Sequence, residues 1–218
     1  MTAGEVLARL RAAANPANVA GMARYGISTA GTLGVPMPAL RALARECGKD
    51  HALALELWAS GIHEGRILAS LVEDRSAVTS RQMNRWIRDV DSWDVCDQLC
   101  QNLFRHMPGA FEQAARWSTA RHEFTRRAAF SLMAGLAVKS KEPDQRFLSL
   151  LPLIRAAAID ERNMVRKAVN WALRQIGKRS PALRRAAVAT ASEIRELGTP
   201  GARWIAADAL RELRAGRP

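Results

Sequence analysis

The sequence has few of the residues that carry covalent, redox or metal chemistry. Its 218 residues include only three cysteines, four histidines and one tyrosine. Three cysteines cannot all pair within one chain, and no CxxC motif or Cys/His cluster has the spacing of zinc ligands, so we expect reduced thiols and no metal site. Ser/His/Asp motifs and glycine-rich phosphate loops are also missing, which argues against the enzyme classes that depend on them.

Long apolar runs are missing as well. The longest nearly apolar stretch, 128–138, is eleven residues and is too short to cross a bilayer. Near the N-terminus Glu5, Arg9 and Arg11 interrupt any apolar signal region. We therefore expect a soluble, cytoplasmic protein without a membrane partner.

Positive charge is in excess. Thirty-three Lys and Arg stand against twenty-one Asp and Glu, a net charge of +12, and only five of the cations are lysines. Codon bias in a GC-rich genome would explain the preference for Arg over Lys, but it would not explain the excess of cations. No block of five like charges occurs, so the charge belongs to folded surface and favours a polyanionic partner, with nucleic acid first.

Ala, Leu, Arg and Glu dominate, and strand-like alternation is absent, which predicts an all-α fold. Helix-breaking proline and glycine residues, with Asn or Ser at helix starts, divide the chain into expected helices near 3–14, 16–25, 36–48, 50–59, 62–74, 79–89, 92–106, 109–118, 121–138, 143–157, 161–178, 180–196 and 200–214. No linker separates two domains, so we expect one domain over residues 1–218.

Three of these segments resemble one another at intervals of about forty residues. They begin at Glu123, Asn163 and Gly201, and each places a basic residue before small and branched apolar residues. This interval is the period of HEAT and armadillo helix pairs, which stack into a solenoid with a concave surface. We predict a HEAT-like solenoid whose concave face is basic; an irregular all-α bundle is the alternative.

An acidic segment, 88–100, stands out in this basic chain. Trp93, Asp97, Cys100 and Phe104 follow one another at i, i+4, i+7 and i+11, a single stripe of an otherwise apolar helix face. A carboxylate there is partly desolvated, which is costly unless it is paired or functional. Asp97 is thus either the partner of an arginine from a neighbouring repeat or a catalytic group.

A second candidate surface lies on the helix expected over 161–178. Trp171 falls beside its apolar stripe, among Lys167, Arg174 and Lys178, where an indole would suit a sugar–phosphate backbone. The alternative is a boundary indole covered by arginine stems. Arg127, on another repeat helix, would contact a phosphate, pair with an inward carboxylate, or be solvated.

Four motifs, taken together, resemble the AlkD family of DNA alkylation repair glycosylases, which are built from HEAT-like repeats. They are MARY at 22–25, SWDVCD at 92–97, RAAF at 127–130 and VRKAVNWALR at 165–174, in the family's order over roughly residues 16–180. Family members often carry an aromatic residue where Ser92 stands and an aliphatic residue where Cys96 stands.

The resemblance implies a catalytic carboxylate at Asp97, groove-lining indoles at Trp93 and Trp171, and a concave-face arginine at Arg127. It also implies a tyrosine near the DNA at Tyr25. The expected activity is excision of N3-alkyladenine and N7-alkylguanine from double-stranded DNA, without a metal or organic cofactor, by a monomer that associates with the nucleoid when bound. Further candidate backbone contacts are Lys167, Arg166 and Arg174.

Two other functions remain open from the sequence. One is a HEAT-repeat module that binds nucleic acid without excising a base. The other is a protein-binding HEAT scaffold, whose concave face would prefer peptides. Neither needs a carboxylate at Asp97.

Overall fold

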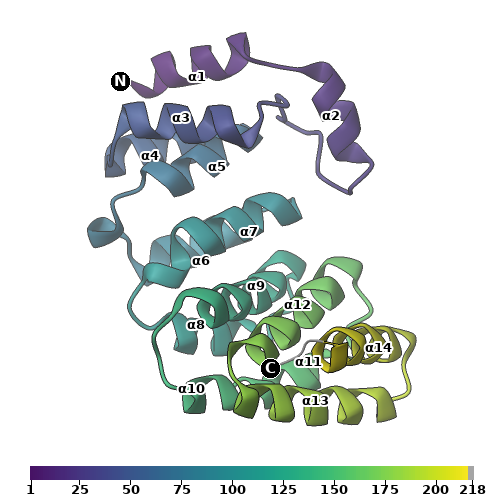
Figure 1. Cartoon of the computed structure of the whole chain (residues 1–218). Helices are drawn as coiled ribbons and strands as arrows, with labels where there is room; N and C mark the ends of the chain where they lie inside the picture. The colour runs from purple at the N-terminus through teal and green to yellow at the C-terminus, as the bar shows by residue number, and fades with distance from the viewer. Residues whose placement is uncertain (216–218) are drawn as a thin grey trace. The chain divides into compact units, whose positions relative to one another are not determined.

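A computed structural model describes residues 1–215, and within this range all regular structure is helical (Figure 1). The prediction of an all-α fold is therefore confirmed. No helix in this range is long and apolar enough to cross a membrane. The range divides into two compact units, unit 1 over Met1–Met107 and unit 2 from Pro108 onward, which are described in turn.

Unit 1 consists of short helices that begin where the sequence offers capping residues. Thr2 forms a capping box with Glu5, and the side chains of Asn15, Asp50 and Thr79 accept hydrogen bonds from the first turns of the following helices. The elements are α1 (Ala3–Ala12), α2 (Pro16–Ala23), α3 (Met37–Cys47), α4 (His51–Ala59), α5 (His63–Val72), a 3₁₀ turn (Arg75–Ala77), α6 (Ser80–Arg88), α7 (Trp93–Asn102) and a 3₁₀ turn (Phe104–His106).

The helix pairs of unit 1 repeat at an interval shorter than forty residues. Side-chain hydrogen bonds link three pairs of positions that are 31 residues apart: Leu33 with Glu64, Trp58 with Asp89, and His63 with Asp94. Helices α3, α5 and α7 pack in sequence, α3 on α5 and α5 on α7. The helix pairs of this unit therefore repeat at about thirty residues, a period that the sequence did not reveal.

Unit 2 contains the longest helices of the described chain. Its elements are α8 (Ala110–Trp117), α9 (Glu123–Lys139), α10 (Asp144–Leu148), α11 (Leu151–Ala157), α12 (Asn163–Arg179), α13 (Pro181–Glu196) and α14 (Pro200–Ala215). The single helix expected over 143–157 is wrong, because the chain breaks it at Ser149 and Leu150. Pro152 sits in the first turn of α11, where its missing N–H costs nothing.

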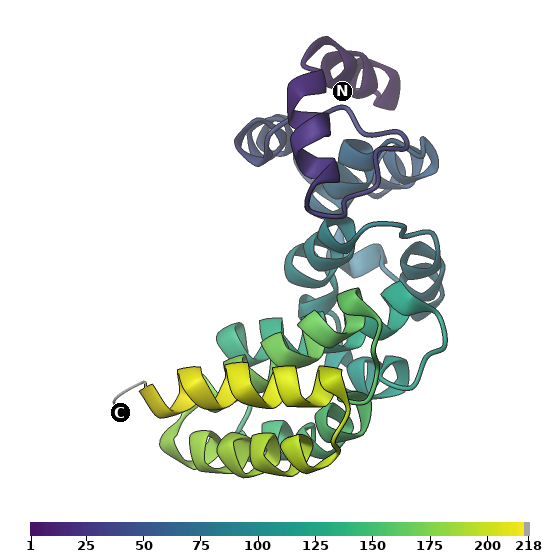
Figure 2. The same cartoon turned by 90° about the vertical axis from the view of Figure 1, so that its right-hand side faces the viewer.

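The three similar segments are neighbours in space. Helix α12 packs against α9 on one side and against α14 on the other, and α13 and α14 lie side by side in Figures 1 and 2. The forty-residue repeat predicted from positions 123, 163 and 201 is therefore confirmed as a packing repeat. Across it, Gly201 N–H donates to the Glu161 carboxylate, 40 residues earlier.

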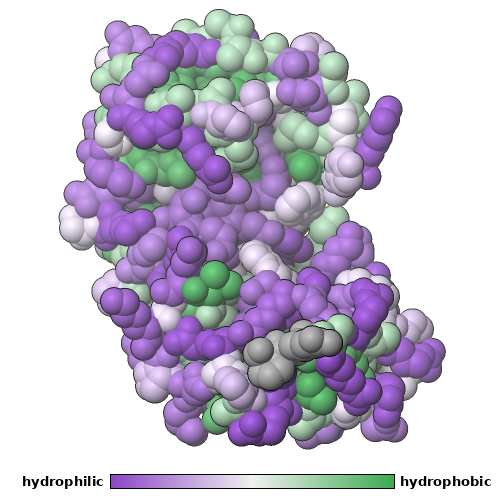
Figure 3. Space-filling view, in the orientation of Figure 1, coloured by the Kyte–Doolittle hydropathy of each residue, from purple (hydrophilic) through white to green (hydrophobic). Residues whose placement is uncertain are grey.

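The apolar faces of these helices lie inside their units. Trp86 and Phe104 in unit 1, and Phe130 and Phe147 in unit 2, are among the largest fully buried side chains. On the face drawn in Figure 3, hydrophilic residues predominate and hydrophobic residues form small separate patches.

Candidate active site

Helix α7 presents Asp97 at the edge of its buried face. That face consists of Val95, Cys96, Leu99 and Cys100, whereas Trp93 and Asp97 are both half-buried. Because they are four residues apart, their side chains lie one above the other on successive turns. The expected apolar stripe is wrong at its far end, since α7 stops at Asn102 and Phe104 is buried in the following 3₁₀ turn.

The start of α7 is fixed by polar contacts. Ser92 is the N-cap residue, and its buried hydroxyl donates a 2.7 Å hydrogen bond to Oδ1 of Asp94. Asp94 in the first turn also complements the positive end of the helix dipole. A small hydroxyl residue at position 92 therefore has a structural task at the start of α7.

Trp93 and Tyr25 are brought together although they are 68 residues apart. The indole Nε1 of Trp93 donates a 3.0 Å hydrogen bond to the backbone carbonyl of Tyr25, which follows the end of α2. Tyr25 is 74% exposed. The hydrogen bond thus orients the indole and holds an exposed aromatic side chain in the same part of unit 1.

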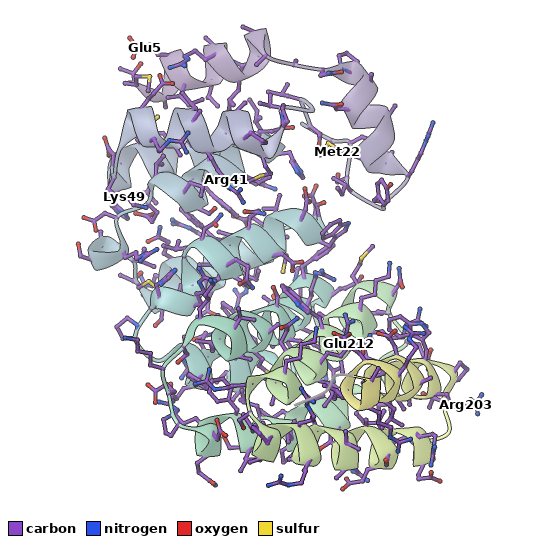
Figure 4. The ribbon with its side chains drawn as sticks, in the orientation of Figure 1. Glu5, Met22, Arg41, Lys49, Arg203 and Glu212 are labelled. Carbon is purple, nitrogen blue, oxygen red and sulfur yellow. The ribbon has the colours of Figure 1, made fainter. Side chains whose placement is uncertain are left out.

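A cavity of about 500 Å³ adjoins this pair in unit 1. Its lining comes from α2, the α2–α3 connection and the first turns of α3, α5 and α7: Ala17, Asn18, Gly21, Met22, Tyr25, Ile27, Gly34, Val35, Pro36, Met37, Leu40, His63, Glu64, Ile67, Trp93 and Asp94. Helix α2, which carries Met22 in Figure 4, has no buried residue of its own. The cavity is mostly apolar, with acidic and imidazole groups at one wall.

A buried ion pair forms part of that wall. His63 Nε2 lies 2.8 Å from Oδ2 of Asp94, with 2% and 16% of their side chains exposed. Burial opposes charge on both groups, but the hydrogen bond and the opposite charges outweigh it: the pKa of His63 is raised and the pKa of Asp94 is lowered. The pair joins the first turns of α5 and α7 and supports the turn that carries Trp93.

Glu64, next to His63, holds the α2–α3 connection. Its carboxylate is 1% exposed and accepts backbone hydrogen bonds from Leu33, Gly34 and Val35 at 2.9, 2.6 and 3.2 Å. Gly34 has φ +79°, and a Cβ there would lie 2.3 Å from the Asn15 carbonyl oxygen, so only glycine fits. This anchoring sets the position of α2 and hence of Tyr25.

In unit 2, Arg127 on α9 is buried, with 5% of its surface exposed. Its guanidinium donates a 2.6 Å hydrogen bond to the backbone carbonyl of Met164 in the first turn of α12. The possibility of a merely solvated arginine is therefore wrong. Phosphate contact and carboxylate pairing both remain compatible with a guanidinium that has further donors.

The cationic face expected around Trp171 is only partly present. Trp171 is half-buried on α12, but Arg174 and Lys178 both form ion pairs with Glu212 of α14, labelled in Figure 4. Arg174 Nη1 also lies 3.6 Å from the Asp208 carboxylate. Burial opposes charge on Glu212, yet the hydrogen bonds from Lys178 and Arg174 keep the pKa of Glu212 below its usual value. This end of the face is neutralised by the next repeat.

The other two cations of α12 differ from each other. The guanidinium of Arg166 lies over the ring of Trp204 at 5.1 Å and donates to Asn163 at 3.2 Å. Lys167 is exposed, and its ammonium group has no carboxylate partner within residues 1–215. Of the predicted contacts on this helix, Lys167 is thus the one that keeps its whole charge for a ligand.

The family model described as DNA alkylation repair enzyme matches residues 6–213, nearly the whole chain. The chain belongs to this family.

A solved structure has the same fold as this DNA alkylation repair family member. It is described as belonging to a new family of proteins related to the HEAT-like repeat DNA glycosylases with affinity for branched DNA structures. The two are 19% identical, with a TM-score of 0.79 over 88% of this chain and 83% of that chain. The likeness confirms the prediction of a HEAT-like helical fold. No curated protein sequence matches the chain.

The sequence did not reveal the cavity of unit 1 in this family member, nor the groups that shape it. His63 and Asp94, like Leu33 and Glu64, are 31 residues apart, and no local motif marks them as partners. Within residues 1–215 no group of His, Cys, Asp and Glu could hold a metal ion. The one signal available was a pair of adjacent polar residues, His63 and Glu64, at the start of an apolar helix.

Proposed function

We propose that this member of the DNA alkylation repair family is a DNA glycosylase that removes positively charged alkylated purines from double-stranded DNA. N3-alkyladenine and N7-alkylguanine are the expected substrates. The observation that carries the proposal is the half-buried carboxylate of Asp97, one helical turn from the half-buried indole of Trp93, in a chain of this family.

The chemistry needs little more than a fixed negative charge. An alkylated purine carries a positive ring, so when its N-glycosidic bond breaks, the bonding electrons neutralise the departing base and no proton has to be supplied. The positive charge then develops on the sugar at C1′. A carboxylate held in a partly desolvated position opposes that charge more strongly than one in bulk water would. Water adds to C1′, releases a proton, and leaves an abasic site.

The indole of Trp93 would act beside the carboxylate. The face of Trp93, oriented by its hydrogen bond to Tyr25, would attract a cationic sugar or base through its quadrupole. We assign Trp171, on α12 of unit 2, the same attraction for a cationic group. No metal or organic cofactor takes part in this reaction.

The predicted contacts would bind the DNA backbone with different strengths. Lys167 keeps its charge, whereas Arg174 shares its charge with Glu212 and would contribute less to phosphate binding. Arg166 and Tyr25 are secondary contacts, and we keep Arg127 as a proposed phosphate contact.

The test compares Asp97→Asn with Asp91→Asn, a matched change at an exposed carboxylate two residues before α7. Each variant is incubated with methylated duplex DNA, and the freed bases are separated by chromatography. We expect Asp97→Asn to lose about 10²–10³ in rate while it still binds DNA, because one electrostatic element of this kind contributes that much. Full excision by Asp97→Asn, or an equal loss in Asp91→Asn, would contradict the proposal.

A second candidate function is recognition of DNA without excision. It is favoured by the solved structure of the same fold, whose description reports affinity for branched DNA. In that case the wild-type chain would retain branched DNA more strongly than linear duplex, and no abasic product would form from alkylated DNA. Chromatography of the freed bases and measurement of DNA binding therefore distinguish the two functions.

A further inference from the structure

A second hollow in unit 1 has three cationic residues among those that line it. It measures about 360 Å³ and lies where α3 and α5 end. Its lining is Arg41, Ala44, Arg45, Gly48, Lys49 and Leu71. Figure 4 labels Arg41 below α3 and Lys49 beyond the end of that helix. We call Arg41, Arg45 and Lys49 the α3 basic cluster.

No carboxylate neutralises this cluster. Within residues 1–215 the side chains of Arg41 and Arg45 have no hydrogen bond or ion pair, and both are exposed. Lys49 Nζ donates to the backbone carbonyl of Leu71 at 2.6 Å, which caps the end of α5, and Lys49 forms no ion pair within residues 1–215.

The acidic residues nearby are already used. Glu46 pairs with Arg9 at 2.6 Å. Glu73 is fully buried and accepts hydrogen bonds from His51 and Gln82, each at 2.6 Å. Asp50 accepts from the first turn of α4. Asp74, whose charge acts on Lys49 together with that of Glu73, accepts two hydrogen bonds from Ser76 at 2.9 Å. A direct ion pair between one of these acids and the cluster would require such a contact to break.

More cations extend the cluster along the ends of α5 and α7. Arg75 donates to the Asn102 carbonyl at 3.3 Å, and Arg105 Nε lies 3.1 Å from Nε2 of His106. Burial, with the charges of Arg75, Arg105 and Lys49, lowers the pKa of His106 to about 4. Burial and the charge of Arg75 also lower the pKa of Lys49. These like charges repel one another, and a bound anion would relieve the repulsion.

Capping of helix ends explains Lys49 and Arg75, but it does not explain Arg41 and Arg45, which contact no carbonyl. Their spacing instead matches an extended polyanion. From Arg41 to Arg45, both on α3, the helical rise of 1.5 Å per residue gives about 6 Å, and phosphates of one DNA strand follow every 3.4 Å along the axis, so the two guanidinium groups are spaced to face neighbouring phosphates.

We infer that the α3 basic cluster is a phosphate-binding site for the backbone of one DNA strand, separate from the Trp93 cavity and from the predicted contacts on α12. The choice of DNA as the source of the phosphates rests on the proposed function; the affinity for phosphate groups does not. Arg41 and Arg45 supply forked donors to phosphate oxygens, and Lys49 adds a point charge.

The test is the double variant Arg41→Gln/Arg45→Gln. Its matched control is Arg81→Gln/Arg85→Gln, which removes two exposed arginines of the same spacing from α6 in the same unit. Binding of undamaged duplex is measured by fluorescence anisotropy at increasing salt, and circular dichroism checks that both variants are folded. We expect the log–log salt slope to fall by about two for the α3 variant, about 0.9 per lost phosphate contact, and to stay unchanged for the control. An equal loss in both variants, or an unchanged slope in the first, overturns the inference.

A second readout locates the bound phosphate. We expect the pKa of His106, measured by NMR, to rise above about 4 when wild-type protein binds DNA. In the α3 variant we expect the pKa of His106 to remain at about 4 when DNA is added. If inorganic phosphate alone raises the pKa of His106 and DNA does not, the site binds a free anion and the assignment to DNA is wrong. Because undamaged DNA is used, failure of base release would refute the proposed function and leave this inference standing.

Discussion

Replacement of Glu64 by glutamine would test how unit 1 holds the connection that positions α2. The buried carboxylate accepts hydrogen bonds from Gly34 and Val35 at Oε1 and from Leu33 at Oε2. Each bond to a charged group contributes about 1.5–3 kcal/mol. Glutamine keeps one carbonyl oxygen for Gly34 and Val35, but it turns an amide N–H toward the N–H of Leu33.

We therefore expect Glu64→Gln to lose one hydrogen bond and the charge assistance of two others, about 2–4 kcal/mol of local stability. A domain is stabilised by about 5–15 kcal/mol, so the chain should still fold. The assay is amide hydrogen exchange at Leu33, Gly34 and Val35. At 1.4 kcal/mol per factor of ten, exchange there should become about thirty- to a thousandfold faster.

Glu56→Gln is the matched control, because Glu56 is exposed on α4 and its carboxylate has no hydrogen bond within residues 1–215. It should change stability by less than about 0.5 kcal/mol and leave those amides unaffected. If Glu64→Gln leaves exchange at Leu33, Gly34 and Val35 unchanged, the anchoring role argued for Glu64 is refuted.

Two further changes test the same wall of unit 1. Gly34→Ala should lower the free energy of unfolding by about 3 kcal/mol, from positive φ plus the clash with the Asn15 carbonyl, whereas Gly61→Ala, with positive φ in open space, should cost about 1 kcal/mol in the same urea titration. For the buried pair, the raised pKa of His63 adds stability that is complete below its unfolded value of 6.5 and is lost as pH rises through the folded value. The lowered pKa of Asp94 adds stability that is present above 3.8 and is lost as acid protonates it. Asp94→Asn should thus be most destabilising near pH 5, by about 1–3 kcal/mol, and less so near pH 9; equal losses at both would contradict the ion pair.

The fold and part of the site follow from short-range patterns in the sequence. Helical periodicity and caps place most helices within two residues of their observed ends, and the spacing of Trp93 and Asp97 correctly puts them on one side of α7. The break between α10 and α11 was missed, because Leu148, Leu150 and Leu151 continue the apolar pattern across it.

The contacts that shape the cavity could not be predicted in the same way. The carboxylate of Glu64 is held by three backbone N–H groups, and backbone donors leave no mark in a sequence. The partner of His63 is one of four aspartates in the segment 89–97, and the choice depends on the thirty-residue register of unit 1. That register has no sequence similarity comparable to the repeats of unit 2.

Charge was the property that the sequence described least well, because a net charge of +12 does not say which cations are available. On α12 the outcome depends in part on which residues of α14 lie 38 positions later. Arg174 meets Glu212 at this offset and is neutralised, and Arg166 meets Trp204 and lies over its ring. Lys167 is exposed, forms no ion pair within residues 1–215 and so keeps its charge. The electrostatic surface of a helical repeat protein is therefore set by the pairing of successive repeats, and the cations left over by that pairing are the ones to assign to a polyanionic ligand.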